Sequence, residues 1–416
     1  MNRRGFLATL GVLSLGGCVG VRYWPDEGIW NGCVEGSLPE SLANHDLVHA
    51  SWEGIDAANV WDCHTHLIGT GDSDSGIWLN PDMESLWHPI QYMQFKFYLN
   101  ASCAGVADSI DQGFIDRLVK LNRQMAKGSK FMLLAFDYHY NEKGERVLEY
   151  SPFYTPNDYA ARVVADNPDH FEWIASIHPY RVDCVEALEQ AVAKGARAVK
   201  WLPGSMGMNP ASQLCDRFYE ALIRFNIPLL VHAGDEHAVP VEGLQFLGNP
   251  LVLRRPLDQG VRVIIAHCAS LGTSADIDKG EDGPEVSNFE LFKRLMADPA
   301  YAQNLYGDIS AVTQVNRDVS IISEIIRHPE WHHRLLNGSD YPLPGVMPVF
   351  SIRSFVNAGL LVLKEAEIIS AIREYNPMLF DFMLKRRIQA DGARLSNSVF
   401  ETRRVFESGS TRISAS

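Results

Sequence analysis

Short apolar runs recur along the chain, separated by longer stretches of mixed polarity. The clearest runs lie at residues 57–61, 196–200, 227–232, 261–267 and 335–340. In the stretch 213–225 between two of them, Phe218, Leu222 and Ile223 recur at helical spacing after Asp216. Strands that alternate with helices imply parallel strand pairing. The pattern predicts an α/β fold, with a (β/α)8 TIM barrel as the arrangement that closes eight such units.

Each of these runs is followed by, or ends in, a polar side chain. The first leads into Asp62-Cys63-His64-Thr65-His66, and the others end at Lys200, His232, His267 and Asp340. Successive side chains of a strand point to opposite faces, so His64 and His66 are expected to share a face. In a barrel the C-terminal strand ends meet at one mouth, where the active sites of this fold lie. Six side chains suited to metal binding or proton transfer should therefore converge.

In order, residue type and placement, these positions resemble the amidohydrolase superfamily, and within it the amidohydrolase-related branch of metal-dependent TIM barrels. The resemblance covers about residues 59–385. It matches His64 and His66 to the first-strand pair, Lys200 to the fourth-strand lysine, His232 and His267 to the fifth- and sixth-strand histidines, and Asp340 to the eighth-strand aspartate. It implies a hydrolase or decarboxylase that uses one or two divalent ions, with Zn as the first expectation.

Metal chemistry accounts for these residue types. Histidine nitrogen and carboxylate oxygen suit Zn, Mn or Fe, and a catalytic site keeps a coordination position open for water or substrate. A bound ion lowers the pKa of that water towards neutrality. We expect Asp340 to take the proton and return it to the leaving group. His267 is the second candidate catalytic residue.

Lys200 leaves three interpretations open. A lysine in a desolvated pocket has a lowered pKa and can react with carbon dioxide to give a carbamate that bridges two ions. In a one-metal site it would stay a cation and pair with a substrate carboxylate. A structural salt bridge is the third interpretation.

Other polar residues near the predicted strand ends are weaker candidates. Positions that could support the ligands or bind a carboxylate are Glu236, His237, Asp308, Arg254, Arg255 and Arg317. Single histidines such as His139, His178 and His328 are more often structural. If the histidines face the barrel interior, Cys63 and Cys268 should face the outer helices as packing residues.

The segment 69–112, between the first strand and its helix, is unusually long for a βα connection. Loops at this face often form lids or contact substrate. Its aromatic side chains could wall a pocket for a cyclic or aromatic substrate, or could anchor the loop itself: Trp78, Trp87, Tyr92, Phe95 and Phe97, with His88 beside them.

The first eighteen residues predict an export signal rather than a fold element. Arg3 and Arg4 form a twin-arginine pair before an apolar stretch at 5–17 that is too short to span a bilayer. The stretch 15–18 resembles a bacterial lipobox ending at Cys18. We expect a periplasmic protein that a lipid at Cys18 anchors to the outer membrane, because Val19 rather than a retention-type aspartate follows. Cleavage to a soluble periplasmic protein is the alternative.

Composition fits one large catalytic domain. We expect residues 19–56 to form a tether and N-terminal segment, 57–390 the barrel, and 391–416 a C-terminal extension and tail. The formal net charge of −14 disfavours nucleic-acid binding, so the expected partner is a small molecule, with self-association left open. A Cys33–Cys103 disulfide is one option, but spacing does not identify cysteine pairs.

Three functions are consistent with the sequence. The first is a hydrolase of an amide, lactone or ester, and the second is a decarboxylase of an aromatic or unsaturated acid. The third is a non-catalytic binding lipoprotein, whose signature would be lost ligands. None of the six matched positions is lost, which favours an enzyme.

Overall fold

The computed structural model describes residues 28–407, apart from residues 35, 240–242 and 281. The predicted export signal at 1–18, Cys18 itself and the tail at 408–416 lie outside the described residues. Within the described part, no helix is long and apolar enough to cross a membrane.

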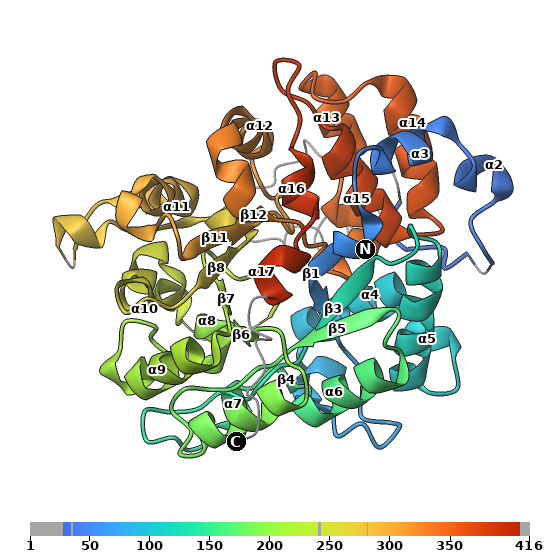
Figure 1. The fold of residues 1–416 in the computed structure, drawn as a ribbon. Helices are drawn as coiled ribbons and strands as arrows, with labels where there is room; N and C mark the ends of the chain where they lie inside the picture. The colour runs from blue at the N-terminus through green and yellow to red at the C-terminus, as the bar shows by residue number, and fades with distance from the viewer. Residues whose placement is uncertain (1–27, 35, 240–242, 281, 408–416) are drawn as a thin grey trace, which may run out of the picture.

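Eight parallel strands form a closed barrel (Figure 1). They are β1 (Trp61–His66), β3 (Lys130–Leu134), β5 (Phe171–Ile174), β6 (Val199–Trp201), β7 (Leu229–His232), β8 (Val263–Ala266), β11 (Leu305–Asp308) and β12 (Leu335–Leu336). Two strand groups, β1-β3-β5 and β6-β7-β8-β11-β12, are joined by a bridge between Ala175 and Val199 and by backbone bonds from β1 to residues 337–341. The predicted α/β barrel is therefore confirmed.

Helices follow the strands and surround the barrel (Figure 1). They are α5 (Ile110–Arg123), α6 (Asn157–Asp166), α7 (Cys184–Ala193), α9 (Asp216–Phe225), α10 (Arg254–Asp258), α11 (Asn288–Ala297), α12 (Val319–Arg327), α13 (Ile352–Asn357), α14 (Leu363–Arg373) and α15 (Pro377–Arg387). The sequence pattern explains α9: its buried face carries Phe218, Tyr219 and Leu222, and Asn226 ends it in a left-handed conformation.

Alternation along the strands separates two apolar clusters. In β7, Leu230 joins the interior cluster, whereas Leu229 and Val231 join the larger cluster between strands and helices. The strand boundaries differ from the expected runs at several places. Residues Ala57–Asn59 form a 3-10 turn, so that β1 begins only at Trp61, and β12 already ends at Leu336.

A bulge in β1 overturns the expected orientation of Cys63. The register with β3 shifts between Asp62 and Thr65, so one residue of β3 faces two of β1. Cys63 consequently joins the interior cluster with Trp61, instead of facing the outer helices. Cys268 does lie in the outer cluster, as expected.

The C-terminal segment closes the N-terminal end of the barrel. Two short helices, α16 (Asn397–Phe400) and α17 (Arg403–Glu407), cross the strand ring in Figure 1. Val405 and Phe406 belong to the interior cluster, and the Thr402 hydroxyl donates to the Trp61 carbonyl. Residues up to 407 are thus part of the barrel core.

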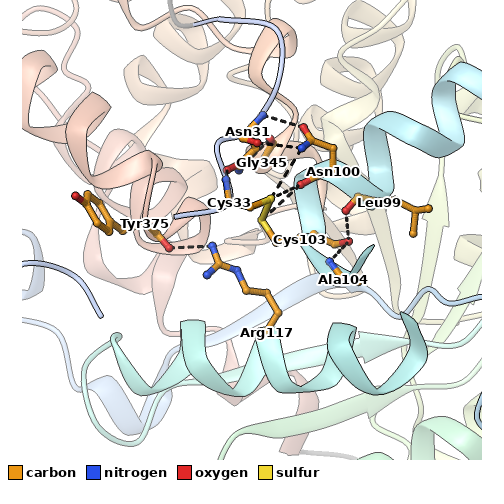
Figure 2. The surroundings of a disulfide bond; sticks show 10 residues. Asn31, Cys33, Leu99, Asn100, Cys103, Ala104, Arg117, Gly345 and Tyr375 are labelled. Atoms are coloured by element: carbon orange, nitrogen blue, oxygen red, sulfur yellow. Dashed lines mark hydrogen bonds between the residues drawn. A yellow bond between two sulfur atoms is a disulfide. The ribbon is translucent and has the colours of Figure 1, made fainter. Parts of the chain in front are cut away.

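Between β1 and α5 the chain forms elements of its own. These are β2 (Trp78–Leu79), which pairs with β4 (Phe153–Tyr154), and α4 (Pro89–Ser102). Helices α2 (Glu40–Ala43) and α3 (Asp46–Trp52) precede the barrel, α8 (Pro203–Met206) follows β6, and a hairpin of β9 (Thr273–Ala275) and β10 (Glu285–Ser287) precedes α11. Cys33 and Cys103 form a disulfide that ties the N-terminal segment to the end of α4 (Figure 2).

Candidate metal centre

The six side chains singled out by the sequence all line one cavity at the C-terminal mouth of the barrel: His64, His66, Lys200, His232, His267 and Asp340. Asp340 Oδ1 lies 3.1 Å from His66 Nε2 and 3.5 Å from His64 Nε2. Lys200 Nζ lies 3.2 Å from the same His64 nitrogen. The ring centres of His232 and His267 are 5.2 Å apart. The predicted convergence is present in the fold.

Asp308 and Ser310 form hydrogen bonds with the Nδ1 atoms of His64 and His267. Asp308 Oδ2 is 2.9 Å from His64 Nδ1, and Ser310 Oγ is 2.8 Å from His267 Nδ1. The Asp308 side chain is fully buried and does not line the cavity. A carboxylate in this position fixes the tautomer of a ligand histidine, so that its Nε2 lone pair faces the cavity. Asp308 was a supporting candidate in the sequence, whereas Ser310 was missed; the Asp-x-Ser pattern after a strand was its only signal.

An unusual backbone conformation sets the direction of two side chains in the site. His267 and Asp340 have φ of 56° and 61°, in the left-handed region. Such residues cost about 1–3 kcal/mol each and persist when their surroundings hold them. Here the His267 amide donates to Asp308 Oδ1 and the Asp340 amide donates to the His64 carbonyl. Ala266 already faces the interior, so this turn is what directs His267 towards the centre as well.

Close packing of β1 against the end of β12 depends on a glycine. A Cβ at Gly338 would lie 2.6 Å from His64 Cβ. No real side chain tolerates that contact, so any larger residue here would displace His64.

The donor set fits a divalent metal. Two groups have ligand atoms within 4.8 Å of one another, His64 with His66 and Asp340, and His64 with His267 and Asp308. Because His64 Nδ1 is engaged by Asp308, the group on the Nε2 side is the one that faces the cavity. His232 Nε2 is buried and has no hydrogen-bond partner among the described residues, while its Nδ1 lies 3.4 Å from Glu236 Oε2. A metal ion would satisfy that nitrogen.

Burial sets the charge states in the centre. It lowers the pKa of Lys200, although the carboxylates of Asp308, Asp340 and Glu236 act in the opposite direction. It also lowers the pKa of His64, His232 and His267, which favours the neutral, metal-binding imidazole. Burial acts to raise the pKa of Asp340, but the nearby His267 and His66 rings hold it well below its usual value. Asp340 is therefore an ionised carboxylate.

The cavity above the centre has a volume of about 190 Å³ and mostly apolar walls. Its apolar lining includes Ile68, Phe97, Phe136, Phe153, Leu202, Leu271, Val346 and Val349. Of the aromatic residues in the first loop, Phe97 lines the cavity, as does Tyr98, which sequence reasoning missed. Trp78 instead packs against Tyr138, and Phe95 is buried as an anchor. Some aromatic residues of this loop thus line the cavity, as Phe97 does, and others anchor the loop itself, as Phe95 does.

Besides Lys200, the basic side chain of Arg317 lines the cavity. Arg317 donates to Gln314 Oε1 and Asn316 Oδ1 and forms no ion pair with a carboxylate among the residues that the structure describes. Gln314 Nε2 beside it is also buried, and it has no hydrogen-bond partner among the described residues. Burial lowers the pKa of Arg317 to about 10, so it stays charged at neutral pH. These donors suit a carboxylate on a bound molecule.

Several weaker candidates lie elsewhere. Arg254 and Arg255 pair with Asp278 and Asp216 outside the cavity. His328 stacks on Trp331 next to Glu330. Glu236 and His237 do line the cavity.

Comparison with known proteins identifies a family for this chain. The family model described as Amidohydrolase matches residues 61–367, well over half of the chain. A comparison with curated proteins found no significant match. Among solved structures, an uncharacterised TIM-barrel protein from Bordetella bronchiseptica is 15% identical with a TM-score of 0.44, covering 76% of this chain and 94% of that one.

Two further solved structures are of proteins named after a reaction. A probable 2-pyrone-4,6-dicarboxylic acid hydrolase from Acinetobacter baumannii is 17% identical, with a TM-score of 0.40, covering 74% of this chain and 95% of that one. A 5-carboxyvanillate decarboxylase from Sphingomonas paucimobilis is 11% identical, with a TM-score of 0.42, covering 76% and 97%. With the family model matched across all eight strands and the histidines, lysine and aspartate gathered at the barrel mouth, the chain belongs to the amidohydrolase family.

Proposed function

We propose that this protein is a metal-dependent hydrolase that cleaves a C–N or C–O bond, in an amide, lactone or ester, of a small molecule. The observation that carries the proposal is the convergence of four histidines, Lys200 and Asp340 on one cavity. His64, His66, His232, His267 and Asp340 would hold the metal, joined by Lys200 if it is carboxylated. A bound divalent ion would supply Lewis-acid activation of water and of the scissile carbonyl.

The chain's own groups orient the reactants and handle the proton. Asp340 is ionised, buried and 3.1 Å from His66, so its carboxylate can accept a proton from an attacking water and deliver it to the leaving group. Asp308 and Ser310 fix the ring orientations of His64 and His267. The apolar walls exclude bulk water, which strengthens these electrostatic interactions.

Arg317 narrows the proposed substrate to a molecule with a carboxylate and an apolar, cyclic or aromatic body. Its guanidinium would pair with the carboxylate while Phe97, Phe136 and Phe153 contact the body. The same feature favours a second candidate, a decarboxylase of an aromatic or unsaturated acid, because that reaction requires a carboxylate substrate.

Product analysis in ¹⁸O-labelled water separates the two reactions. A panel of lactones, esters, amides and aromatic acids that carry a carboxylate is incubated with the metal-loaded protein. A hydrolase incorporates one ¹⁸O atom into the product, whereas a decarboxylase releases carbon dioxide and leaves the remaining product unlabelled.

Asp340→Asn tests the proton-transfer role on whichever substrate turns over. The amide keeps the size of the side chain but cannot take up the proton, so kcat should fall by about 10²–10⁴. Turnover near the wild-type rate would remove Asp340 from the mechanism. Metal content measured on the same sample shows whether Asp340 also contributes to metal binding.

We also propose that the protein is exported through the twin-arginine signal and acylated at Cys18. The Cys33–Cys103 disulfide supports this, because disulfides persist in oxidising compartments such as the periplasm. Arg3→Lys with Arg4→Lys should hold the precursor in the cytoplasm. Recovery of this double variant in the periplasm at the wild-type level would contradict the proposal.

A further inference from the structure

Exposed apolar side chains lie in the turn before α4 and along this helix, which lines part of the cavity. Leu86 and Trp87 in the preceding turn are 75% and 92% exposed, and Ile90 in the first turn of the helix is 42% exposed. Trp30 in the N-terminal segment is 49% exposed. An exposed tryptophan with aliphatic neighbours is typical of surfaces that contact the interfacial region of a bilayer. We call these four residues the α4 rim.

The start of the described chain lies along this same helix. The Trp30 ring stacks on Phe97 with centroids 4.8 Å apart, and Asn31 exchanges two hydrogen bonds with Asn100. The Cys33–Cys103 disulfide fixes the segment covalently (Figure 2). Ile90 and Phe97 are seven residues apart, and so lie on one face of α4. Residues 30–33 are therefore held against the helix that carries part of the α4 rim.

The proposed acylation site is close to this point along the chain. Cys18 precedes Gly28 by ten residues, a distance that a fully extended chain covers in at most about 35 Å. Gly28 is two residues from Trp30. An acyl chain on Cys18 would keep the α4 rim near the bilayer surface, because the tether begins at the rim itself.

We propose that the α4 rim rests on the lipid bilayer and turns the mouth of the barrel towards it. The inference goes beyond the hydrolase function and rests on acylation of Cys18. Gln94, Phe97 and Tyr98 of α4 line the cavity, and Tyr98 donates to the Ala238 carbonyl in the loop after β7. The rim and the cavity thus share one helix, so a substrate that partitions into lipid would reach the cavity from the membrane side.

Local charge indicates which lipid the rim fits. Asp82 and Glu84 lie just before it, and Asp82 Oδ1 lies 3.3 Å from His88 Nε2. Acidic groups beside the rim disfavour an anionic surface. Contact should therefore be strongest with zwitterionic lipid, and the acyl chain and apolar rim should supply most of the binding.

Site-specific labelling of the full-length, acylated protein tests the orientation. The four free cysteines among the described residues are all buried, so a cysteine introduced at an exposed site provides a selectively reactive thiol. Trp87→Cys labels the rim. Ile223→Cys is the control: Ile223 is 45% exposed near the end of α9, where the chain returns to the start of β7 at the opposite end of the barrel. Each variant is labelled with an environment-sensitive dye and reconstituted into phosphatidylcholine vesicles whose acyl chains carry a nitroxide quencher.

The label at position 87 should be quenched several-fold more strongly than the label at position 223. In nitroxide-free vesicles, a water-soluble quencher should reach the label at position 223 more readily than the label at position 87. Equal quenching of both labels by the soluble quencher would mean that the rim stays in water. A protein that floats with the vesicles while both labels are quenched equally would overturn the proposal. Mass spectrometry that shows no acyl chain on Cys18 would also overturn the proposal. A blue shift of the position-87 dye in the absence of vesicles would overturn it too, because the rim would then contact a second copy of the chain.

Discussion

Two buried aspartates at the mouth of this barrel stand in contrasting histidine-rich surroundings. Asp308, at the end of β11, is bonded to His64 and leaves the other side of that ring facing the cavity. Asp137, just after β3, accepts from the His178 amide and pairs with Arg181 at 2.9 Å. The Asp308 region therefore presents ring nitrogens to the cavity. The Asp137 region forms a closed polar network.

The histidines beside Asp137 form ring hydrogen bonds with the backbone, His178 through both nitrogens and His139 through Nδ1. His178 Nε2 donates to the Met206 carbonyl, and its Nδ1 accepts from the Tyr180 amide. His139 Nδ1 donates to the Ser205 carbonyl, and a Cβ at Gly207 would lie 2.3 Å from this ring. Burial lowers the pKa of His178 to about 3, so it remains neutral. A buried histidine at a strand end is thus a candidate ligand only when one nitrogen is left facing a cavity.

Removal of the first-strand pair should give the largest difference between the two regions. His64→Ala with His66→Ala deletes two ligands from the same centre, so the purified protein should lose its metal almost completely. Elemental analysis after growth with ample metal measures this. If a folded double variant kept its metal at the wild-type level, the Asp308 region would not be the metal centre that distinguishes it from the Asp137 region.

Neutralising the two aspartates in turn sharpens the comparison. Asp308→Asn keeps the shape but removes the charge that supports His64, and should weaken metal affinity by about 10–100-fold. Asp137→Asn makes the same change in the closed network and should leave metal affinity unchanged. Competition with a chelator measures both. An equal loss in the two variants would mean that Asp308 acts only through general folding.

The smallest effect on metal is expected from His178→Leu. The change removes the partner of the Tyr180 amide, which costs about 1–3 kcal/mol of unfolding free energy. The Met206 carbonyl loses one of its two hydrogen bonds and still accepts from the Tyr140 amide. Metal content should stay at the wild-type level. Denaturant unfolding and elemental analysis on one preparation check both parts, and a metal-free but stable variant would contradict the assignment of His178 to the closed network.

The sequence predicts the barrel and its six cavity residues because both follow from local patterns. Lys200, His232 and their neighbours lie in apolar runs whose alternation carries over into the strands. Parallel strands bring all such ends to one mouth whatever the length of the connections. The convergence of these residues therefore needs no knowledge of tertiary packing.

Departures from regular alternation could not be predicted in the same way. The bulge in β1 turns Cys63 inward, and the left-handed turn at His267 re-aims that ring. Both depend on how neighbouring strands pair. Ser310 is an ordinary loop residue in the sequence, and its role arises only from a ring that is distant along the chain, that of His64. The Cys33–Cys103 pairing likewise required the position of α4.

Closure of the barrel floor by α17 makes the order of synthesis matter for folding. Val405 and Phe406 cover the interior that Trp61 and Leu230 line, and they are translated after every strand of the barrel. Until they arrive, the strands enclose an interior that is open to water at one end. The native core can therefore be completed only after α17 has been translated. A chain that stops before residue 403 should remain expanded and sensitive to protease although it contains every residue of the metal centre.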